Sequence, residues 1–557
     1  MKKCKRAVAL IISLVMCLVL AAACGNSGSS PTSESAPESS PAFSPASSPP
    51  ATASTTPAPP QMVEPPPKAP DIVFADHIDV ILDNNIGVIN PFSPAANNTP
   101  TNWAFILIFD RLLNRNDDTG EYEPALATSW TTADYQTFVL DLREDVYFHN
   151  GDHFTAHDVV YTVELSREIG AASQGAAQWA PVNAVTALSD YRVEFVLNFV
   201  YFDFYFNLST TSACILNKRA IEANLETGTW VGTGAYEVAE FVSNDYVKLA
   251  RNDRFWDDRL IITTPNLTLR YIPEMATRTT RMETGESQLS FGTSSEDLSI
   301  FRNKSDDYEV FQLKFNNPQG LSFNMNDPIT SDWNFRMAVM YAMDKDDIAF
   351  FAAADGAEGD YISGTIWGNR TEFRNDDIPV IPHNIDKAKE HLAMSVYDGE
   401  EVELAAAIPT NISAAQALQQ QLKVVGINTR IAEYDSPGLS AYMFDPNSGS
   451  QMIFLAVAFT LSSASFRNIF YPNGSQNRMW YNNPVITQMI DEVAAMLDRD
   501  EREAHFRKMQ EIIAEDPPYV TVFWRINGIV AARGVGGLKM PADHMSTDLR
   551  QIYWILD

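Results

Sequence analysis

The stretch from Glu123 to Tyr161 reads EPALATSWTTADYQTFVLDLREDVYFHNGDHFTAHDVVY. Large apolar side chains recur at every second position from Phe138 to Leu142, a period of two that predicts a half-buried strand. Asn150-Gly151 predicts a tight turn, because both residues tolerate positive φ. Thr155, with Asp158 three residues later, predicts the capped start of a helix. A strand, a turn and a helix are therefore expected here, and the rest of the chain decides what they belong to.

The first 23 residues have the pattern of an export signal. Basic residues precede an apolar run from Ala7 to Leu20, and Ala21-Ala22-Ala23 supplies the small residues that a signal peptidase accepts. Cys24 follows at once and resembles the acylated first residue of bacterial lipoproteins, so we expect residues 1–23 to be removed and Cys24 to carry lipid. An uncleaved membrane anchor is the alternative, because about 17 apolar residues is the lower limit for a membrane span.

Residues 24–70 differ in composition from the rest of the chain. Pro, Ser, Thr and Ala dominate, and residues 25–70 hold 13 of the 32 prolines. Such a segment buries too little apolar surface to offset the entropy lost on ordering. We therefore expect a disordered tether that leaves the folded part outside the membrane, free to reach a partner on its surface.

Charge and cysteine content limit the possible partners. The formal net charge is −31 at pH 7, and binding to nucleic acid relies on Lys and Arg, so no nucleic-acid partner is expected. The acidity is typical of a well-solvated surface, and a bias towards cationic ligands is the alternative. With Cys24 lipidated, Cys214 has no disulfide partner in the mature chain, and its neighbours predict a small buried side chain.

A length of 557 residues predicts two or three domains. From residue 71 onward, strand-like and helix-like segments alternate without a repeat of 20–50 residues, which predicts a mixed α/β or α+β fold. Strands are expected at 78–82, 192–197, 238–242, 246–249, 321–325, 452–459 and 519–524. The aromatic run from Phe199 to Phe206, which follows the second of these strands, is expected to lie in the core or at an interface rather than to stack on a ligand. Helices are expected at 103–113, from a Ser331 cap to Met343, from an Asn384 cap to Ala393, from a Ser413 cap to Val425, along 486–497, and after a capping box of Asp500 and Glu503.

The sequence lacks the common catalytic motifs: a Walker A loop, HExxH, paired CxxC and GxSxG are all absent. His149, His153 and His157 are spaced four apart, but the expected turn divides them between a strand end, a loop and a first helical turn. We therefore expect no metal site and no cofactor. The many acidic residues leave one alternative open, a hydrolase with a pair of carboxylates.

Several blocks in a fixed order carry a resemblance that covers essentially all of residues 71–557. The first block comprises Glu123-Pro124-Ala125-Leu126-Ala127, Ser129-Trp130, Phe138, Leu140, Leu142-Arg143, Val146, Phe148-His149-Asn150-Gly151, Thr155-Ala156 and Asp158-Val159. The later blocks comprise Gly232-Thr233-Gly234-Ala235-Tyr236, Leu249, Arg251-Asn252, Phe255-Trp256, Phe323-Asn324, Arg336, Ala338, Ala342-Met343-Asp344, Ile348, Asp386, Ala388-Lys389, Leu392, Asn477, Tyr481-Asn482-Asn483-Pro484, Arg502, Gln510 and Pro518. Together they resemble the solute-binding proteins of ABC importers in the peptide/nickel class, family 5.

The resemblance implies a fold and a role. The fold is periplasmic-binding-protein-like, type II, with a ligand cleft between two lobes built from three domains. Lobe one comprises 71–112, 213–316 and 524–557, an inserted domain comprises 113–212, and lobe two comprises 317–523. The implied role is that of a monomeric, non-enzymatic receptor, held at the extracytoplasmic face of the bacterial membrane by lipid at Cys24. It would pass a peptide-like or other medium-sized polar solute to a membrane permease that works with an ATPase.

The resemblance also indicates where the ligand is chosen. In peptide-binding relatives the apolar strand is followed by Gly-Trp-x-x-Asp, and the aspartate pairs with the ligand's α-amine. Here Phe459 stands at the Trp and Ser462 at the Asp, so an ammonium group lacks its usual partner and the ligand is expected to be decided around residues 459–465. The residues expected to line the cleft are Asn97, Trp179, Gln319, Phe459 and Ser462. A peptide, a sugar and a metal chelate stay open as ligands, and a surface hydrolase or a sensor without transport stays open as the role.

Overall fold

The computed structural model describes residues 72–556 except 83, 94, 95, 97, 98, 117, 118, 171–173, 294, 353–356, 359–363, 369, 370, 446, 458–462, 464, 475 and 540–546. Contacts divide the chain into Met1–Ala69 and Pro70–Asp557, and everything below concerns the second unit. The export signal, Cys24 and the tether lie outside the described residues, so what was expected of them stays a prediction. No helix in the described part of the chain is long and apolar enough to cross a membrane.

A mixed sheet of eleven strands runs through this unit. Its order is β16-β15-β17-β13-β18-β12-β2-β11-β10-β9, and β14 pairs with β18 at the side. The strands are β2 His77–Leu82, β9 Tyr236–Val242, β10 Tyr246–Arg251, β11 Asn266–Tyr271, β12 Leu289–Thr293, β13 Tyr308–Phe323, β14 Ala357–Glu358, β15 Val402–Ala406, β16 Thr429–Glu433, β17 Met452–Ala456 and β18 Tyr519–Ala532. Because parallel pairs (β2 with β11 and β12, β15 with β16 and β17) stand beside antiparallel ones, the mixed class expected from the sequence is confirmed.

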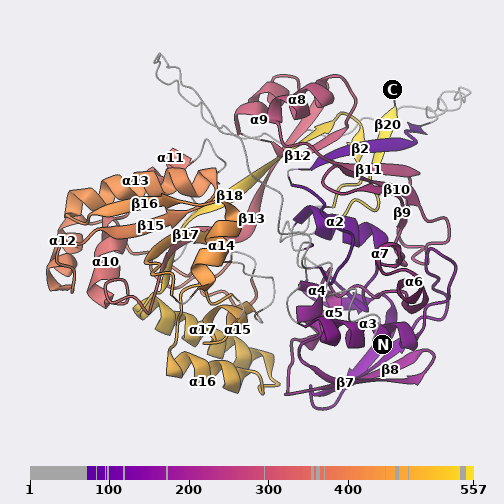
Figure 1. Cartoon of the computed structure of the whole chain (residues 1–557), viewed down its shortest axis with the longest axis horizontal. Helices are drawn as coiled ribbons and strands as arrows, with labels where there is room; N and C mark the ends of the chain where they lie inside the picture. Colours follow the sequence, from indigo (N-terminus) through magenta and orange to yellow (C-terminus); the bar gives the residue numbers. More distant parts are fainter. Residues whose placement is uncertain are drawn as a thin grey trace, which may run out of the picture. The chain divides into compact units, whose positions relative to one another are not determined.

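Two long strands, β13 and β18, pair antiparallel in the middle of the sheet and connect its two halves (Figure 1). One end of the pair lies beside β12, and the other lies beside β17. Their register shifts between Lys314 and Pro318, so the ladder is interrupted there. The expected boundaries between the lobes, at residues 316/317 and 523/524, fall inside these two strands. The names lobe one, inserted domain and lobe two are kept below for the residue ranges given above.

The inserted domain holds a four-stranded antiparallel sheet in the order β5-β6-β8-β7. Its strands are β5 Ala127–Thr132, β6 Thr137–Leu142, β7 Val182–Ser189 and β8 Arg192–Leu197, next to the short pair β3 Leu113–Arg115 and β4 Tyr122–Pro124. Along β6, buried and half-buried side chains alternate, as the period of two predicted. Gly151 has a φ of +87° and donates its N–H to the Phe148 carbonyl at 2.8 Å, which closes the expected turn. Thr155 and Asp158 form a capping box at the start of α3 (Ala156–Ile169).

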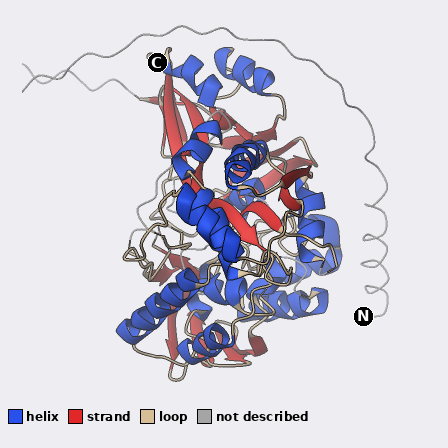
Figure 2. Cartoon of the chain, turned by 90° about the vertical axis from the view of Figure 1, so that its left-hand side faces the viewer, coloured by secondary structure: helices blue, strands red, loops and turns tan. Residues whose placement is uncertain are grey.

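Helices accompany each part of the unit, and Figure 2 shows those of lobe two in front of its strands. Lobe one contains α2 Thr99–Ile108, α6 Lys218–Ala223, α7 Leu225–Gly228, α8 Met275–Glu283 and α9 Ser295–Arg302, and the inserted domain adds α4 Gln174–Gln178 and α5 Phe204–Ser209. Lobe two contains α10 Trp333–Ala342, α11 Lys345–Ala352, α12 Ile385–Met394, α13 Pro409–Val425, α14 Ser436–Phe444, α15 Ser465–Phe470, α16 Pro484–Val493 and α17 Arg499–Glu515. A small sheet of β1 Val73–Phe74, β20 Tyr553–Leu556 and β19 Val535–Gly536 completes the described elements.

Three of the expected helix starts were wrong, two of them because a neighbouring residue caps better. Asp332, not Ser331, caps α10 by accepting from the Phe335 N–H. Asp498 caps α17 from a position before the proposed Asp500–Glu503 box. A carboxylate also interacts favourably with the positive end of the helix dipole, which favours Asp at these positions.

The third start, at Ser413, was wrong because α13 begins four residues earlier, at Pro409. Proline suits the first helical position, since its φ is already helical and its missing N–H is not needed there. The predicted helix 103–113 also ends early, at Ile108, and the chain then enters β3 at Leu113. The Asn384 cap of α12 is confirmed by its bond from the Lys387 N–H.

The hydrophobic cores show which parts are built as one piece. One cluster contains Val80 and Trp103 from lobe one together with Phe138 and Phe195 from the inserted domain. Two further clusters lie in lobe two, around Leu418 and around α16 and α17. Lobe one and the inserted domain therefore share one core, and lobe two has two of its own.

Candidate functional site

Within the part of the chain that the structure describes, the inserted domain contacts lobe two through a segment from Phe199 to Asp203. This segment follows β8, and the backbone bond from the Tyr201 N–H to the Tyr135 carbonyl, 2.8 Å, fixes it to the inserted domain. Asp203 is only 5% exposed and stands at the N-cap of α5, but its side chain makes no capping bond to that helix. Instead, its Oδ2 accepts from Ser463 Oγ of lobe two at 3.4 Å.

Two arginines of lobe two contact the aromatic rings of the same segment. The Arg502 guanidinium lies 4.4 Å from the ring centre of Phe202, and that of Arg467 lies 5.8 Å from the ring centre of Phe199. Such cation–π contacts are attractive because the ring face carries negative charge. We call Phe199, Phe202 and Asp203 together with Ser463, Arg467 and Arg502 the inter-lobe contact.

Lobe two holds both arginines in place through its own helices. Arg502 is on α17 and donates to the carbonyls of Met496, at 3.0 Å, and Leu497, at 2.8 Å, just beyond the end of α16. Arg467 is on α15 and forms an ion pair with Asp491 of α16 at 3.0 Å. The inter-lobe contact on this side is therefore a preformed surface.

The inter-lobe contact encloses a cavity of about 30 Å³. That volume holds about one water molecule. Its lining is largely aromatic and aliphatic: Phe199, Tyr201, Phe202, Asp203, Ser463, Phe466, Arg467, Ile490, Val493, Ala494 and Phe506. Burial raises the pKa of the Tyr201 hydroxyl, and the charge of Asp203 raises it further, so this phenol is a neutral group at physiological pH.

Gln319 lies where β13 resumes its pairing after the register shift. It is 4% exposed and faces Ala456 across the ladder, and its Oε1 is buried without a hydrogen-bond partner among the residues that the structure describes. The Ala456 carbonyl accepts from Arg478 Nη1 at 3.0 Å, and burial lowers the pKa of that guanidinium. A buried acceptor without a partner costs free energy, and a ligand that donates a hydrogen bond to it would recover that cost. Among the residues expected to line the cleft, Gln319 therefore has an acceptor atom that a ligand could use.

A second cluster of motif residues joins the inserted domain to lobe one. His149 donates its N–H to the Gly232 carbonyl at 2.9 Å, and the Gly232 N–H donates back to His149 Nδ1 at 3.2 Å. Nε2 then carries the ring proton and lies 3.1 Å from the Gly234 carbonyl. Burial lowers the pKa of His149 to about 4, so the ring is neutral at physiological pH. We call this cluster, with Gly232 and Gly234, the domain junction.

The glycines of the domain junction permit a close approach of two backbones. A Cβ on Gly232 would lie 1.9 Å from the Ile108 carbonyl oxygen, and one on Gly234 would lie 2.5 Å from the Leu107 carbonyl oxygen. Between them, Thr233 Oγ1 donates to Asp110 at 2.9 Å, and Trp256 Nε1 donates to the same carboxylate at 2.7 Å. The two sequence blocks therefore act as one structural joint.

The other two histidines of the 149–157 run are held separately. His153 lies 2.8 Å from the Glu144 carbonyl through Nε2 and 2.9 Å from the Tyr191 hydroxyl through Nδ1. His157 lies at the surface, 3.4 Å from Asp190. In the described part of the chain no group of three or more His, Cys, Asp or Glu side chains is placed to hold a metal ion.

The residues expected to line the cleft fall into two groups. Asn97, Phe459 and Ser462 lie outside the described residues, so their assignment stays a prediction. Trp179 is 0% exposed in the core of the inserted domain, with its ring stacked on Phe195 at 6.2 Å. Its role in the cleft also stays a prediction, as does that of Gln319.

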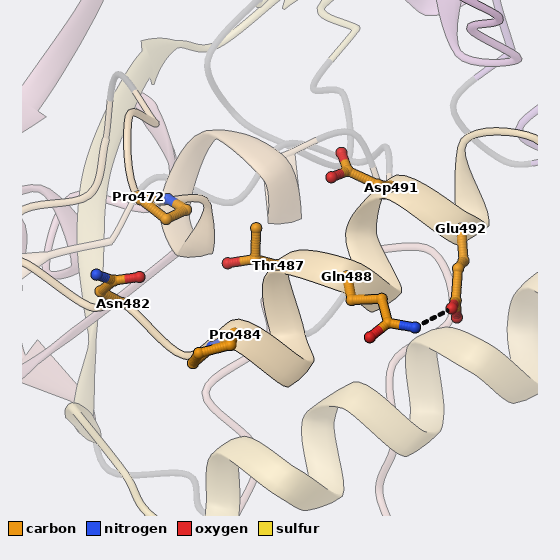
Figure 3. Close-up of a pocket in the computed structure, with 7 residues that line it drawn as sticks. All are labelled: Pro472, Asn482, Pro484, Thr487, Gln488, Asp491 and Glu492. Carbon is orange, nitrogen blue, oxygen red and sulfur yellow. Dashed lines mark hydrogen bonds between the residues drawn. The ribbon is translucent and has the colours of Figure 1, made fainter.

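A wider hollow of about 650 Å³ lies on the surface of lobe two at the start of α16 (Figure 3). Gln488 and Glu492 bond to each other there at 2.7 Å, and Asp491 points the other way, to Arg467. The Asp491 and Glu492 carboxylates of this hollow therefore already have partners, and we do not assign the hollow a ligand.

Sequence reasoning did not single out Asp203, Arg467 or Arg502 for the site. One signal was present: the aromatic run from Phe199 to Phe206, for which a core or interface position was expected. That expectation is confirmed, because Phe202 packs against the core cluster of lobe two and Phe204 is fully buried. Ser463 lies in the 459–465 stretch that was expected to decide the ligand.

Comparisons with known proteins agree with this architecture. Residues 121–477 match the family described as bacterial extracellular solute-binding proteins, family 5 (middle). The oligopeptide-binding protein AppA of Bacillus subtilis is 23% identical over 450 residues, which cover 75% of this chain and 80% of that protein. The substrate-binding protein CtaP of Listeria monocytogenes has a crystal structure similar to this one, with a TM-score of 0.76, 21% identity, and coverage of 86% of this chain and 100% of that one.

A third relative widens the range of ligands found on this fold. NikA of Staphylococcus aureus, crystallised with Ni(L-His)2, is similar with a TM-score of 0.71 and 18% identity, over 86% of this chain and 100% of that one. At these identities the structural likeness establishes the fold alone. It is the mixed, periplasmic-binding-protein-like type II fold expected from the sequence, and that expectation is confirmed.

Proposed function

The chain belongs to the bacterial extracellular solute-binding proteins of family 5, the non-enzymatic substrate-binding components of ABC importers, and on that premise we propose that it is a lipid-anchored receptor for a peptide-like or other medium-sized polar solute. Lipid at Cys24 holds it at the extracytoplasmic face of the membrane, and the 24–70 segment is a tether. Lobe two closes on lobe one and the inserted domain around the solute. The closed form then presents it to the permease.

One observation carries this proposal. The first body, lobe one with the inserted domain, and the second body, lobe two, have separate cores but share strands β13 and β18. Two rigid bodies joined by a pair of strands can rotate about the joint without repacking either core, which is the requirement for hinge closure. The register shift between Lys314 and Pro318 supports a hinge at that point. The division into 71–112, 213–316 and 524–557, then 113–212, then 317–523 is proposed on the same ground.

The class of ligand is proposed from the relatives and from the chain's own residues. AppA is named for oligopeptides, whereas the NikA structure contains a nickel–histidine complex, so the fold accommodates both. In this chain Ser462 offers no charge for an ammonium group, while Gln319 Oε1 is a buried acceptor that a ligand N–H or O–H would satisfy. A ligand that presents neutral hydrogen-bond donors fits these two residues best, with Asn97, Trp179 and Phe459 as further proposed contacts.

A ligand panel tests the proposal. Tryptophan fluorescence and small-angle scattering of the full chain are followed while free peptides, end-blocked peptides, oligosaccharides and metal–amino-acid complexes are added. We expect one class to quench or shift the fluorescence and to reduce the radius of gyration, because closure buries the ligand. Chromatography of the recovered ligand should show it unchanged. If no class changes either the fluorescence or the radius of gyration, the proposed role is refuted.

The choice of ligand is tested at Ser462. Ser462→Asp supplies a carboxylate for a free α-amine, so we expect a gain in affinity for free peptides of about tenfold, the scale of one charge-assisted hydrogen bond. End-blocked peptides, which lack the amine, serve as the control and should bind equally to both forms. An unchanged affinity for free peptides would place the ligand amine elsewhere.

The lipid anchor is tested at Cys24. Cells labelled with an alkyne analogue of palmitate should yield a labelled protein in the membrane fraction, and Cys24→Ala should lose the label. Cys214→Ala is the matched control, because Cys214 is 2% exposed and should not affect labelling. A membrane-bound Cys24→Ala protein would point to an uncleaved anchor instead.

A further inference from the structure

We propose that the inter-lobe contact is a clasp that favours the closed form without help from the ligand, and so sets how tightly any ligand is held. This inference rests on the proposed function only where it concerns affinity. The clasp joins protein to protein, so its effect on closure can be measured in the chain alone. Phe199, Phe202 and Asp203 are its inserted-domain side, and Ser463, Arg467 and Arg502 are its lobe-two side.

The contacts of the clasp come from two helices of lobe two, α15 and α17, and from the residues just before α15. Ser463 precedes α15, Arg467 lies on α15, and Arg502 lies on α17. Phe202 also packs against the hydrophobic cluster that contains Phe466 and Phe506. One short segment of the inserted domain therefore meets a polar, a cationic and an apolar partner at once, which is the composition of a specific interface rather than of a chance touch.

The dimensions of the clasp exclude a role as the ligand pocket. Its cavity of about 30 Å³ is smaller by about tenfold than the pockets that take small organic ligands. The Asp203 carboxylate faces Ser463 at 3.4 Å, and both side chains are buried. The clasp is therefore a surface that the two bodies share, and the ligand has to bind elsewhere between them.

A contact made only in the closed form raises the apparent affinity for every ligand that the closed form holds. The apparent dissociation constant equals the intrinsic one divided by the fraction of chains that are closed, so each contact that raises this fraction tightens binding. A desolvated cation–π pair accounts for about a tenfold change, and a more exposed one for about threefold. The clasp thus adjusts affinity without contacting the ligand, and it does so equally for different ligands.

Phe202→Ala tests the clasp in the full chain. Without any ligand, small-angle scattering should show a larger radius of gyration for Phe202→Ala than for the unchanged protein. Hydrogen exchange should rise in the peptides that contain residues 199–206 and 463–470. Phe202→Tyr keeps the ring and should restore both readings. Phe350→Ala, at a site 76% exposed on α11, is the matched control and should change neither.

The outcome that overturns the clasp needs no ligand. If Phe202→Ala and Phe350→Ala give the same radius of gyration and the same exchange in 199–206 and 463–470, the contact does not hold the lobes together. Should Phe202→Ala fail to fold by circular dichroism, Phe202→Leu replaces it, because leucine keeps apolar bulk and loses only the aromatic face. For any ligand found in the panel, we expect Phe202→Ala to weaken binding about three- to tenfold, and by the same factor for different ligands. A factor that differs between ligands would mean that Phe202 touches the ligand itself, and the clasp would be rejected as its explanation.

Discussion

The domain junction and the inter-lobe contact both join separate parts of the chain, but they are built from different materials. At the domain junction, the His149 backbone N–H donates to the Gly232 carbonyl, the Gly232 N–H donates to Nδ1 of the His149 ring, and Gly232 leaves no room for a side chain. At the inter-lobe contact, the bonds are between side chains: a ring with a guanidinium, and a carboxylate with a hydroxyl. A backbone joint admits very few residue types, whereas a side-chain contact can be made by many. The domain junction can therefore be recognised in a sequence and is a fixed part of the fold. The inter-lobe contact cannot be recognised in this way, and we propose that it opens and closes.

The largest effect is expected where the backbones touch. Gly232→Ala places a Cβ 1.9 Å from the Ile108 carbonyl oxygen, so the two backbones must separate, and we expect a loss of about 3 kcal/mol or more in the free energy of unfolding. Urea unfolding followed by circular dichroism measures it. Gly285→Ala is the control: its φ is +72° with no atom within 4 Å, so it tests backbone strain alone, at about 1 kcal/mol. Equal losses for the two variants would show that the close approach is not the reason for Gly232.

The domain junction should also respond to pH. His149 has a pKa of about 4 in the folded protein, because burial disfavours its charged form, against 6.5 for a free side chain. Above pH 6.5 the ring is neutral in both states. As the pH falls from 6.5 to 4, the unfolded chain takes up a proton that the folded chain refuses, so stability falls by up to about 3 kcal/mol.

Urea unfolding at pH 7 and pH 4.5 checks this expectation. His149→Gln cannot titrate, so its stability should change less than that of the unchanged protein over this range. His157→Gln, at the surface, is the matched control and should keep the full pH response. An undiminished response in His149→Gln would assign the pH dependence to another group.

The inter-lobe contact should show a smaller, purely pairwise energy. A double-mutant cycle of Phe202→Leu with Arg502→Lys should give a coupling of about 1 kcal/mol in ligand affinity. The ring and the planar guanidinium lie 4.4 Å apart, and either single substitution already removes their contact, so the second substitution has no further contact to remove. The same cycle with Phe350→Leu in place of Phe202→Leu should give a coupling near zero. Additive effects of Phe202 and Arg502 would mean that the two side chains do not act as a pair.

The smallest effect on stability is expected at Gln319. Gln319→Met removes a buried acceptor that has no partner in the described part of the chain, so stability should stay the same or rise by up to about 1 kcal/mol. Gln510→Met is the matched control: it is also buried, but Thr365 and Asn375 donate to its Oε1, so about 2 kcal/mol should be lost. Ligand affinity should fall in Gln319→Met alone. If it does not, Gln319 is not a cleft residue.

Much of the fold could be predicted because local rules act within a few residues. The alternation along residues 138–142 and the Thr155–Asp158 capping box need no partner from elsewhere in the chain to be recognised. Helix starts failed where two capping residues competed, as at Asp332 beside Ser331. The long strands β13 and β18 were underestimated, since expectations of 321–325 and 519–524 covered only the lobe-two end of each.

The site could be predicted less well, because it depends on residues far apart in sequence. Asp203 and Ser463 are 260 positions apart. Asp203 belongs to no motif, and Ser463 was covered only as part of the stretch 459–465, with no partner indicated. Gln319 was named from its position in the fold, but its lack of a hydrogen-bond partner is visible only in the structure. Side-chain contacts across a hinge leave no periodic or spaced pattern, so sequence reasoning reached the aromatic run 199–206 and not its partners.

The shared strands have a consequence for how the protein is made. β18 stands between β12 of lobe one and β13, which carries the ladder on to lobe two, and it is supplied by residues 519–532. When the chain is exported with its amino terminus first, lobe one and lobe two both lack strand β18 until residues 519–532 have followed. Pairing over such long sequence distances is slow, and unpaired strand edges are prone to aggregate meanwhile. We expect the two lobes to finish folding together, late, and only after residue 532 has been exported.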